Sequence, residues 1–130
     1  MIVFANGCFD ILHPGHIHTL KFAKQLAGQD GKVIVGLNSD SSIALIKRKP
    51  IFNEQFRKTM LESLRYVDEV RIFETETPYL LIKEIKPDYI VKGPDYINKQ
   101  VIGNDIALVL FASQGLEIST TKIIEEIKKR

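Results

Sequence analysis

The chain has 130 residues, of which 45% are hydrophobic and 26% charged, and its formal net charge is +2. These values are typical of an ordinary globular domain, and the charge is too small to indicate binding to nucleic acid or to a membrane surface. The single cysteine, Cys8, excludes an internal disulfide, and with no membrane-span or signal-peptide pattern we expect one cytoplasmic domain over residues 1–130.

Short apolar runs alternate with amphipathic segments from one end of the chain to the other. The predicted order begins with a strand at 2–5, a helix from Pro14 to a stop at Gly28, a strand at 32–37 and a helix over 56–64. It continues with a strand at 69–73, a helix capped by Thr77-Pro78, strands at 89–91 and 106–111, and a last helix after 119–121. This alternation predicts an α/β fold, a Rossmann-like doubly wound parallel sheet of five strands with helices on both faces.

All three histidines, His13, His16 and His18, lie within six positions, just after the first predicted strand. In parallel sheets, ligands bind beyond the carboxyl ends of the strands, so this stretch is expected to border a binding crevice. His13 and His16 are three residues apart across the first helical turn and are expected to point to one face. His18 lies about 200° round the helix from His16, so we expect it to face away, toward solvent or a dimer contact.

Glycines and backbone N–H groups in the same stretch suit an anion. Gly7 permits a tight turn with close approach of a phosphate, and Pro14-Gly15 is expected to start the helix with free N–H donors. Two other interpretations stay open: histidines that merely cap the helix, and a zinc site. For zinc, Asp10 is the only close carboxylate, and no cysteine pair completes a ligand set.

Several motifs in order resemble one enzyme superfamily. His13-Pro14-Gly15-His16 matches the H-x-G-H signature of the nucleotidyltransferases, and GCFDILH precedes it as in that superfamily. NSD (38–40), Lys47, Arg57, RYVDEV (65–70), KGPDY (92–96) and ISTTKI (118–123) follow in the same order. Within the superfamily the chain most resembles the adenylyltransferases of bacterial ADP-heptose synthesis, which act on D-glycero-β-D-manno-heptose 1-phosphate.

The likeness to glycerol-3-phosphate cytidylyltransferases is weaker. RYVDEV and ISTTKI are found there too, but those enzymes carry threonine in place of Cys8 and arginine in place of Gln114. The basic loop 47–50 is shorter than the Lys-Gly-x-x-Arg-Pro pattern of the heptose enzymes, and the segment between 105 and 118 is also short. Both differences bear on the acceptor more than on the chemistry.

The resemblance implies transfer of a nucleotidyl group from a nucleoside triphosphate to a phosphate, in line and without a covalent intermediate. It implies Mg²⁺ held mainly by phosphate oxygens and water, with few dedicated protein ligands, and a homodimer formed near 65–70. Lys92 and Asp95 are expected near the ribose and base or near the metal. The residues it assigns to catalysis are His13, His16, Lys47 and Ser119. Those assigned to the nucleotide are Gly7, Cys8, Phe9, Gly15, Lys92, Gly93, Asp95, Thr120 and Thr121, and those assigned to the acceptor are Lys47, Lys49 and Arg57.

Simpler roles compete with these assignments. Residues 119–121 could only cap a helix, Lys47 could only be solvated, and Arg57 could pair with Glu54 one turn back. Asp10 could orient the turn that carries the histidines or, as we expect, simply cap it. For the whole chain, the alternatives are a CTP-dependent enzyme acting on glycerol 3-phosphate or another phospho-alcohol, an FMN adenylyltransferase, and a nucleotide-binding sensor without turnover.

Overall fold

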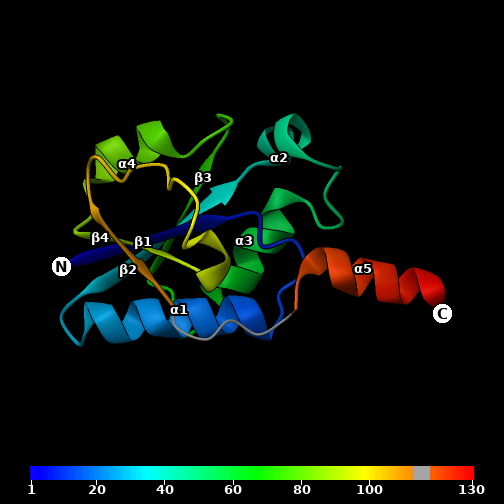
Figure 1. Ribbon diagram of the computed structural model, residues 1–130, viewed down its shortest axis with the longest axis horizontal. Coiled ribbons are helices and arrows are strands. Elements are labelled where there is room, and N and C mark those ends of the chain that lie inside the picture. Colours follow the sequence, from blue (N-terminus) through cyan, green and yellow to red (C-terminus); the bar gives the residue numbers. More distant parts are fainter. Residues whose placement is uncertain (113–117) are drawn as a thin grey trace.

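The computed structural model describes residues 1–112 and 118–130, and strands and helices alternate along it (Figure 1). The strands are β1 (Ile2–Gly7), β2 (Lys32–Asn38), β3 (Glu69–Phe73), β4 (Tyr89–Lys92) and β5 (Leu108–Phe111). The helices are α1 (Pro14–Ala27), α2 (Asp40–Ile46), α3 (Glu54–Glu62), α4 (Tyr79–Ile85) and α5 (Thr120–Lys129), with a 3-10 turn η1 (Pro94–Tyr96). Among the described residues, no helix is long and apolar enough to cross a membrane.

The five strands form one sheet in the order β3-β2-β1-β4-β5, and every pair is parallel. The predicted doubly wound parallel sheet is therefore confirmed. The strand order reverses between β1 and β4, so the loops that leave these two strands diverge there and open a crevice.

Alternating side chains of the strands supply two apolar cores, one on each face of the sheet. Val3 and Val33 belong to the cluster that α1 and α3 cover, through side chains such as Leu20 and Leu61. Phe4 and Ile34, one position along each strand, belong to the opposite cluster with Ile82 of α4. The burial of both faces explains why the strands read as continuous apolar runs in the sequence.

Two local details differ from the sequence prediction. The Thr77-Pro78 pair is shifted from the expected cap: Pro78 is the N-cap, and α4 begins at Tyr79, whose N–H donates to Oγ1 of Thr77 at 3.5 Å. Strand β5 begins at Leu108, because Ile106 and Ala107 close a turn onto the carbonyl of Gly103, whose φ is +94°.

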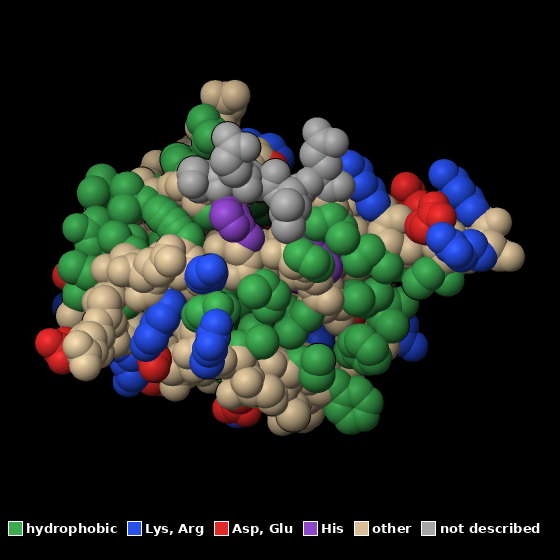
Figure 2. Space-filling model, turned by 90° about the horizontal axis from the view of Figure 1, so that it is seen from below, with side chains coloured by type: hydrophobic (Ala, Val, Ile, Leu, Met, Phe, Trp, Pro, Cys, Tyr) green, Lys and Arg blue, Asp and Glu red, His purple; other side chains and the backbone are tan. Residues whose placement is uncertain are grey.

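Helix α5 extends past the edge of the sheet (Figure 1) and has no buried residue. Its free end carries side chains of both charges (Figure 2), including an ion pair between Arg130 and Glu126. Basic residues in the last turn suit the negative end of the helix dipole, as expected from the sequence. The start of α5, in contrast, reaches the crevice through Thr120, whose hydroxyl donates to the carbonyl of Ile11 at 3.4 Å.

Candidate active site

A cavity of about 580 Å³ opens at the switch point between β1 and β4. Its volume lies in the range of small-molecule sites. It is walled by the loop after β1, the first turns of α1, the 47–48 segment, the loop after β4 with η1, and the start of α5. The predicted site residues that line it are Gly7, Cys8, Phe9, His13, Gly15, His16, Lys47, Lys92, Gly93, Asp95, Ser119, Thr120 and Thr121.

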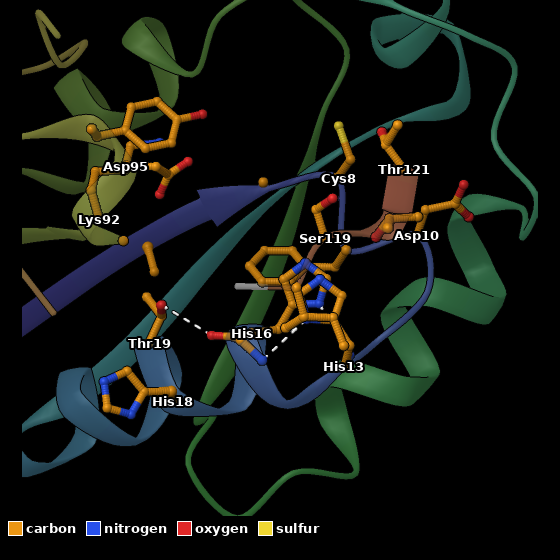
Figure 3. A pocket seen from close by; sticks show the side chains of 18 of the residues that line it. Cys8, Asp10, His13, His16, His18, Thr19, Lys92, Asp95, Ser119 and Thr121 are labelled. Atoms are coloured by element: carbon orange, nitrogen blue, oxygen red, sulfur yellow. Dashed lines mark hydrogen bonds between the residues drawn. The ribbon is translucent and has the colours of Figure 1, made fainter. Parts of the chain in front are cut away.

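His13 and His16 form a stacked pair at the start of α1 (Figure 3). Their ring centroids are 3.8 Å apart and the ring planes meet at 26°. His13 is the N-cap of the helix, and its Nδ1 accepts a hydrogen bond from the N–H of Gly15 at 3.1 Å. Nδ1 of His16 accepts from the N–H of His13 at 3.3 Å, which completes a capping box made of two imidazoles.

These bonds fix which nitrogen of each ring can serve a ligand. Because Nδ1 accepts in both rings, the neutral tautomer carries its proton on Nε2 and leaves Nε2–H as the donor. Burial lowers the pKa of His13. Burial, with the positive charges of His13 and Lys47, lowers the pKa of His16 to about 4. Both rings are therefore neutral donors near pH 7.

The backbone of this region differs from the sequence prediction in two ways. The N–H of Gly15 is not a free donor, because the His13 ring occupies it. The turn also has a left-handed residue that the sequence did not indicate, Phe9, with φ +46°. Both glycines leave room for a ring: a Cβ at Gly7 would lie 3.2 Å from the Phe9 ring, and a Cβ at Gly15 would lie 2.9 Å from the His13 ring.

Asp10 holds the 47–52 segment against the site and does not cap its own turn. Its buried carboxylate accepts from the N–H of Ile51 at 2.8 Å and of Phe52 at 2.9 Å. It also lies 3.6 Å from Nη2 of Arg48. The predicted cap on its own turn was therefore wrong. The partners of Asp10 are about 40 residues away and leave no local pattern in the sequence.

Arg57 lies outside the lining of the cavity, on the buried side of α3. Its side chain has no exposed surface, so the expected direct contact with substrate does not fit this placement. Its ion pair is also not with Glu54: Nη2 lies 2.7 Å from Asp40. Glu54 instead accepts from the N–H of Asp40 at 2.9 Å. The periodicity of α3 does not reveal a buried guanidinium, since arginine normally marks the exposed side of a helix.

Lys92 and Asp95 lie across the cavity from Asp10 and Thr121 (Figure 3). The Lys92 ammonium group stands 4.6 Å from the ring centre of Tyr96. Burial lowers the pKa of Lys92 to about 8, and the charge of Asp95 partly opposes this shift. A Cβ at Gly93 would lie 2.8 Å from a carboxylate oxygen of Asp95, so a side chain at this position would displace that carboxylate.

The hydroxyl residues before α5 combine capping with placement in the cavity. Ser119 is the N-cap, and its Oγ accepts from the N–H of Lys122 at 3.1 Å. The lone pair is used by the helix, while the O–H proton of Ser119 stays available for an anion. Thr121 is exposed at the cavity wall. The position of Gln114, by contrast, lies outside the described residues.

Several lining residues were not predicted. His18 was expected to face away, yet it lines the cavity with Thr19, because the cavity runs along the side of α1 beyond the stacked pair (Figure 3). Arg48 and Tyr96 also line the cavity, whereas only their neighbours Lys47 and Asp95 were predicted to do so. Lys49 does not; it borders a second hollow of about 300 Å³ beside α2 and α3.

Among the residues described, no group of three or more His, Cys, Asp or Glu side chains is placed to hold a metal ion.

The parallel sheet, the crevice at its switch point and the paired imidazole donors define a nucleotide-binding α/β domain of the nucleotidyltransferase type. The family model described as cytidylyltransferase-like matches residues 4–126, and the chain belongs to this family.

Curated relatives named Bifunctional protein HldE are 48% identical in Helicobacter pylori and 50% identical in a Nitratiruptor species. Each match covers 98% of this chain, which spans only 28% of the length of these relatives. A solved structure, the lipopolysaccharide core biosynthesis protein from Thermoplasma volcanium GSS1, is 31% identical with a TM-score of 0.74. That match covers 88% of this chain and 97% of the other.

Proposed function

We propose that the chain transfers AMP from ATP to D-glycero-β-D-manno-heptose 1-phosphate, giving an ADP-heptose and pyrophosphate. The observation that carries the proposal is the stacked His13–His16 pair, two neutral N–H donors fixed at the mouth of a switch-point cavity. The identity to HldE proteins and the likeness to a lipopolysaccharide core biosynthesis protein support a sugar phosphate as acceptor.

The reaction needs no protein nucleophile. An oxygen of the acceptor phosphate attacks the α-phosphorus of ATP, a new P–O bond forms, and the bond from the α-phosphorus to the bridging oxygen breaks as pyrophosphate leaves. A phosphate monoester is already a dianion near neutral pH, so no general base is required. Rate acceleration then comes from positioning and from donors aimed at the charge that develops on the phosphates.

Each wall of the cavity has a role in this scheme. The Nε2–H groups of His13 and His16 donate to the α-phosphate and the departing phosphates, and Ser119 and Thr120 donate to the distal phosphates. Lys92 and Asp95 serve the nucleoside side, beside Gly93. Mg²⁺ bound to the triphosphate neutralises part of its charge, and phosphate oxygens and water supply most of its ligands.

The acceptor enters from the side of the 47–50 segment. Lys47 is exposed, lines the cavity, and its charge reaches His16, so it is suited to attract a second phosphate. Lys49, outside the cavity lining, contributes only to the field that draws an anion toward this rim. We propose a cytoplasmic protein, where the ATP that this reaction consumes is supplied.

A pyrophosphate-release assay with Mg²⁺ tests the proposal, with ATP and CTP each combined with heptose 1-phosphate and with glycerol 3-phosphate. We expect release only from ATP with the heptose. Release from CTP with glycerol 3-phosphate would replace this function by the cytidylyltransferase activity that the family name and RYVDEV favour. A further reaction with ATP and FMN tests flavin adenylylation. ATP binding without pyrophosphate release from any of these combinations would identify a nucleotide sensor.

We also propose a homodimer formed around residues 65–70. Arg65 is exposed, its guanidinium lies 5.1 Å from the ring centre of Tyr66, and its Nη2 donates to the Tyr66 hydroxyl at 3.1 Å. Asp68 in the same segment is used within the chain, paired with Lys24 at 2.9 Å. Light scattering of the wild type and of Tyr66→Ala measures the mass, and a monomeric wild type would exclude the dimer.

A further inference from the structure

The buried guanidinium of Arg57 connects the segments that surround the cavity. Its Nη1 donates to the carbonyl of Cys8 at 2.9 Å and to the carbonyl of Asn38 at 2.7 Å. Its Nε donates to the carbonyl of Phe52 at 2.9 Å, and its Nη2 donates to Asp40 at 2.7 Å. One cation therefore fixes the turn after β1, the end of β2 and the loop before α3.

The contact with Cys8 has a direct effect on the cavity wall. The Cys8–Phe9 peptide bond is trans, so its N–H points away from the side on which Arg57 holds its carbonyl. Within the described part of the chain, the N–H of Phe9 donates to no hydrogen-bond acceptor. Both Cys8 and Phe9 line the cavity, whereas Arg57 does not.

The conformation of Phe9 is one that a side chain of its size rarely adopts. With φ at +46°, it requires a compensating interaction that holds the turn. The charge-assisted bond from Arg57 to the carbonyl of Cys8 supplies this compensation. A cation on the carbonyl also polarises the peptide and makes its N–H a stronger donor.

We propose that Arg57 is a positioning residue that orients and polarises the Cys8–Phe9 peptide, so that the Phe9 N–H donates to a phosphate of the bound nucleotide. The inference rests on the proposed nucleotidyl transfer, and it replaces direct substrate contact as the role of this arginine. Lysine cannot substitute for it, because a single ammonium group cannot reach the three carbonyls and the carboxylate that the planar fork bridges.

The kinetic test compares Arg57→Lys with the wild type, with Arg130→Lys at the exposed end of α5 as the matched control. We expect Arg57→Lys to stay folded by circular dichroism and to lose about 100-fold in kcat, the size of effect expected from a misplaced donor. The KM values for ATP and the sugar phosphate should stay within about threefold, since charge and binding area are kept. A kcat within about threefold of wild type, or a rise in KM with kcat unchanged, overturns the proposal.

A second measurement follows the backbone amide itself. In ¹⁵N-resolved spectra of the wild type, added inorganic pyrophosphate should move the Phe9 resonance, while the amide of Ile51, bonded to Asp10, stays in place. In Arg57→Lys the Phe9 movement should be lost. An unmoved Phe9 resonance in the wild type, or equal movement in both proteins, overturns the positioning role.

The two proposals fail in different ways. If the wild type releases no pyrophosphate from any substrate pair, the proposed function is wrong, and the amide titration still decides what Arg57 does. If the wild type turns over and Arg57→Lys matches it, only the positioning role is wrong. Should Arg57→Lys not fold, the wild-type titration still tests the Phe9 donor on which the proposal depends, and an unmoved Phe9 resonance overturns it.

Discussion

His13 and His16 hold each other in place: the His16 ring accepts from the backbone N–H of His13, and the two rings stack at 3.8 Å between centroids. Each imidazole thus has its orientation and tautomer set before any ligand arrives. Preorganised donors of this kind stabilise developing charge without a reorganisation cost during the reaction.

Removal of either ring is expected to stop turnover. His16→Ala and His13→Ala each delete one phosphate donor, and such a loss typically lowers kcat by about 100- to 1,000-fold. Pyrophosphate release under saturating substrates measures the effect, with exposed Gln25→Ala on the same helix as control. A folded His16→Ala variant with wild-type kcat would refute the mechanism.

The low pKa of His16 also predicts how stability depends on pH. In the unfolded chain this histidine binds a proton near pH 6.5, but in the folded protein only near pH 4. The unfolded state therefore binds more protons between these values, and the free energy of unfolding falls as the pH drops from 6.5 to 4. The loss amounts to at most about 3 kcal/mol. Urea unfolding across this range should show a shallower dependence for His16→Gln; identical slopes in both proteins would contradict the burial of this ring.

Gly15→Ala tests the contact between the helix start and the His13 ring. The new methyl group would lie 2.9 Å from Cε1 of His13, so the ring must turn away from its place against His16. We expect kcat to fall about 100-fold, the scale of a small misplacement, while alanine keeps the helix stable. The thermal midpoint and kcat are measured together. A large loss of midpoint with unchanged specific activity would show that the contact is only structural.

Lys92 predicts a change of activity at alkaline pH. With a pKa of about 8, its ammonium group loses its charge as the pH rises through that value, and attraction for the triphosphate is lost. Because kcat/KM reports groups of the free enzyme, kcat/KM for ATP should fall above pH 8. Lys92→Arg should remove this fall, since arginine stays charged. A fall that persists unchanged in Lys92→Arg would assign it to another group.

Asp10→Asn should affect binding of the acceptor and leave binding of the nucleotide nearly unchanged. The change weakens the acceptor for two backbone N–H groups of the 51–52 segment and removes the charge opposite Arg48. We expect KM for the sugar phosphate to rise about tenfold, as for the loss of one charge-assisted bond, with KM for ATP little changed. Asp30→Asn, in the exposed turn before β2, is the control. Equal increases in both KM values would show that Asp10 supports the whole site.

The parallel sheet and the histidine cluster could be predicted from sequence because their signals are local. Apolar runs, helix stops and the spacing of His13 and His16 each lie within a few residues. The roles of Asp10 and Arg57 could not, because their partners are set by how distant loops pack. Arg57 reaches Cys8, 49 residues away, and no periodicity encodes such a contact.

The predicted orientation of the His18 side chain was wrong for a different reason. The helical angle was correct, but it says nothing about the width of a cavity that borders α1 along its length. Gly7 was expected to permit the tight turn, whereas the left-handed conformation falls on Phe9, where tertiary bonds compensate the strain.

The anchoring of the 47–52 segment has a consequence for how this enzyme could change its substrate. Asp10 holds the far end of the segment by its backbone, through the N–H groups of Ile51 and Phe52, and backbone atoms are the same whatever side chains occur there. Residues 47–49 can therefore be exchanged for another short sequence while the histidine pair keeps its geometry. Grafted loops could redirect the domain to new phosphorylated acceptors, with the chemistry at the nucleotide inherited intact.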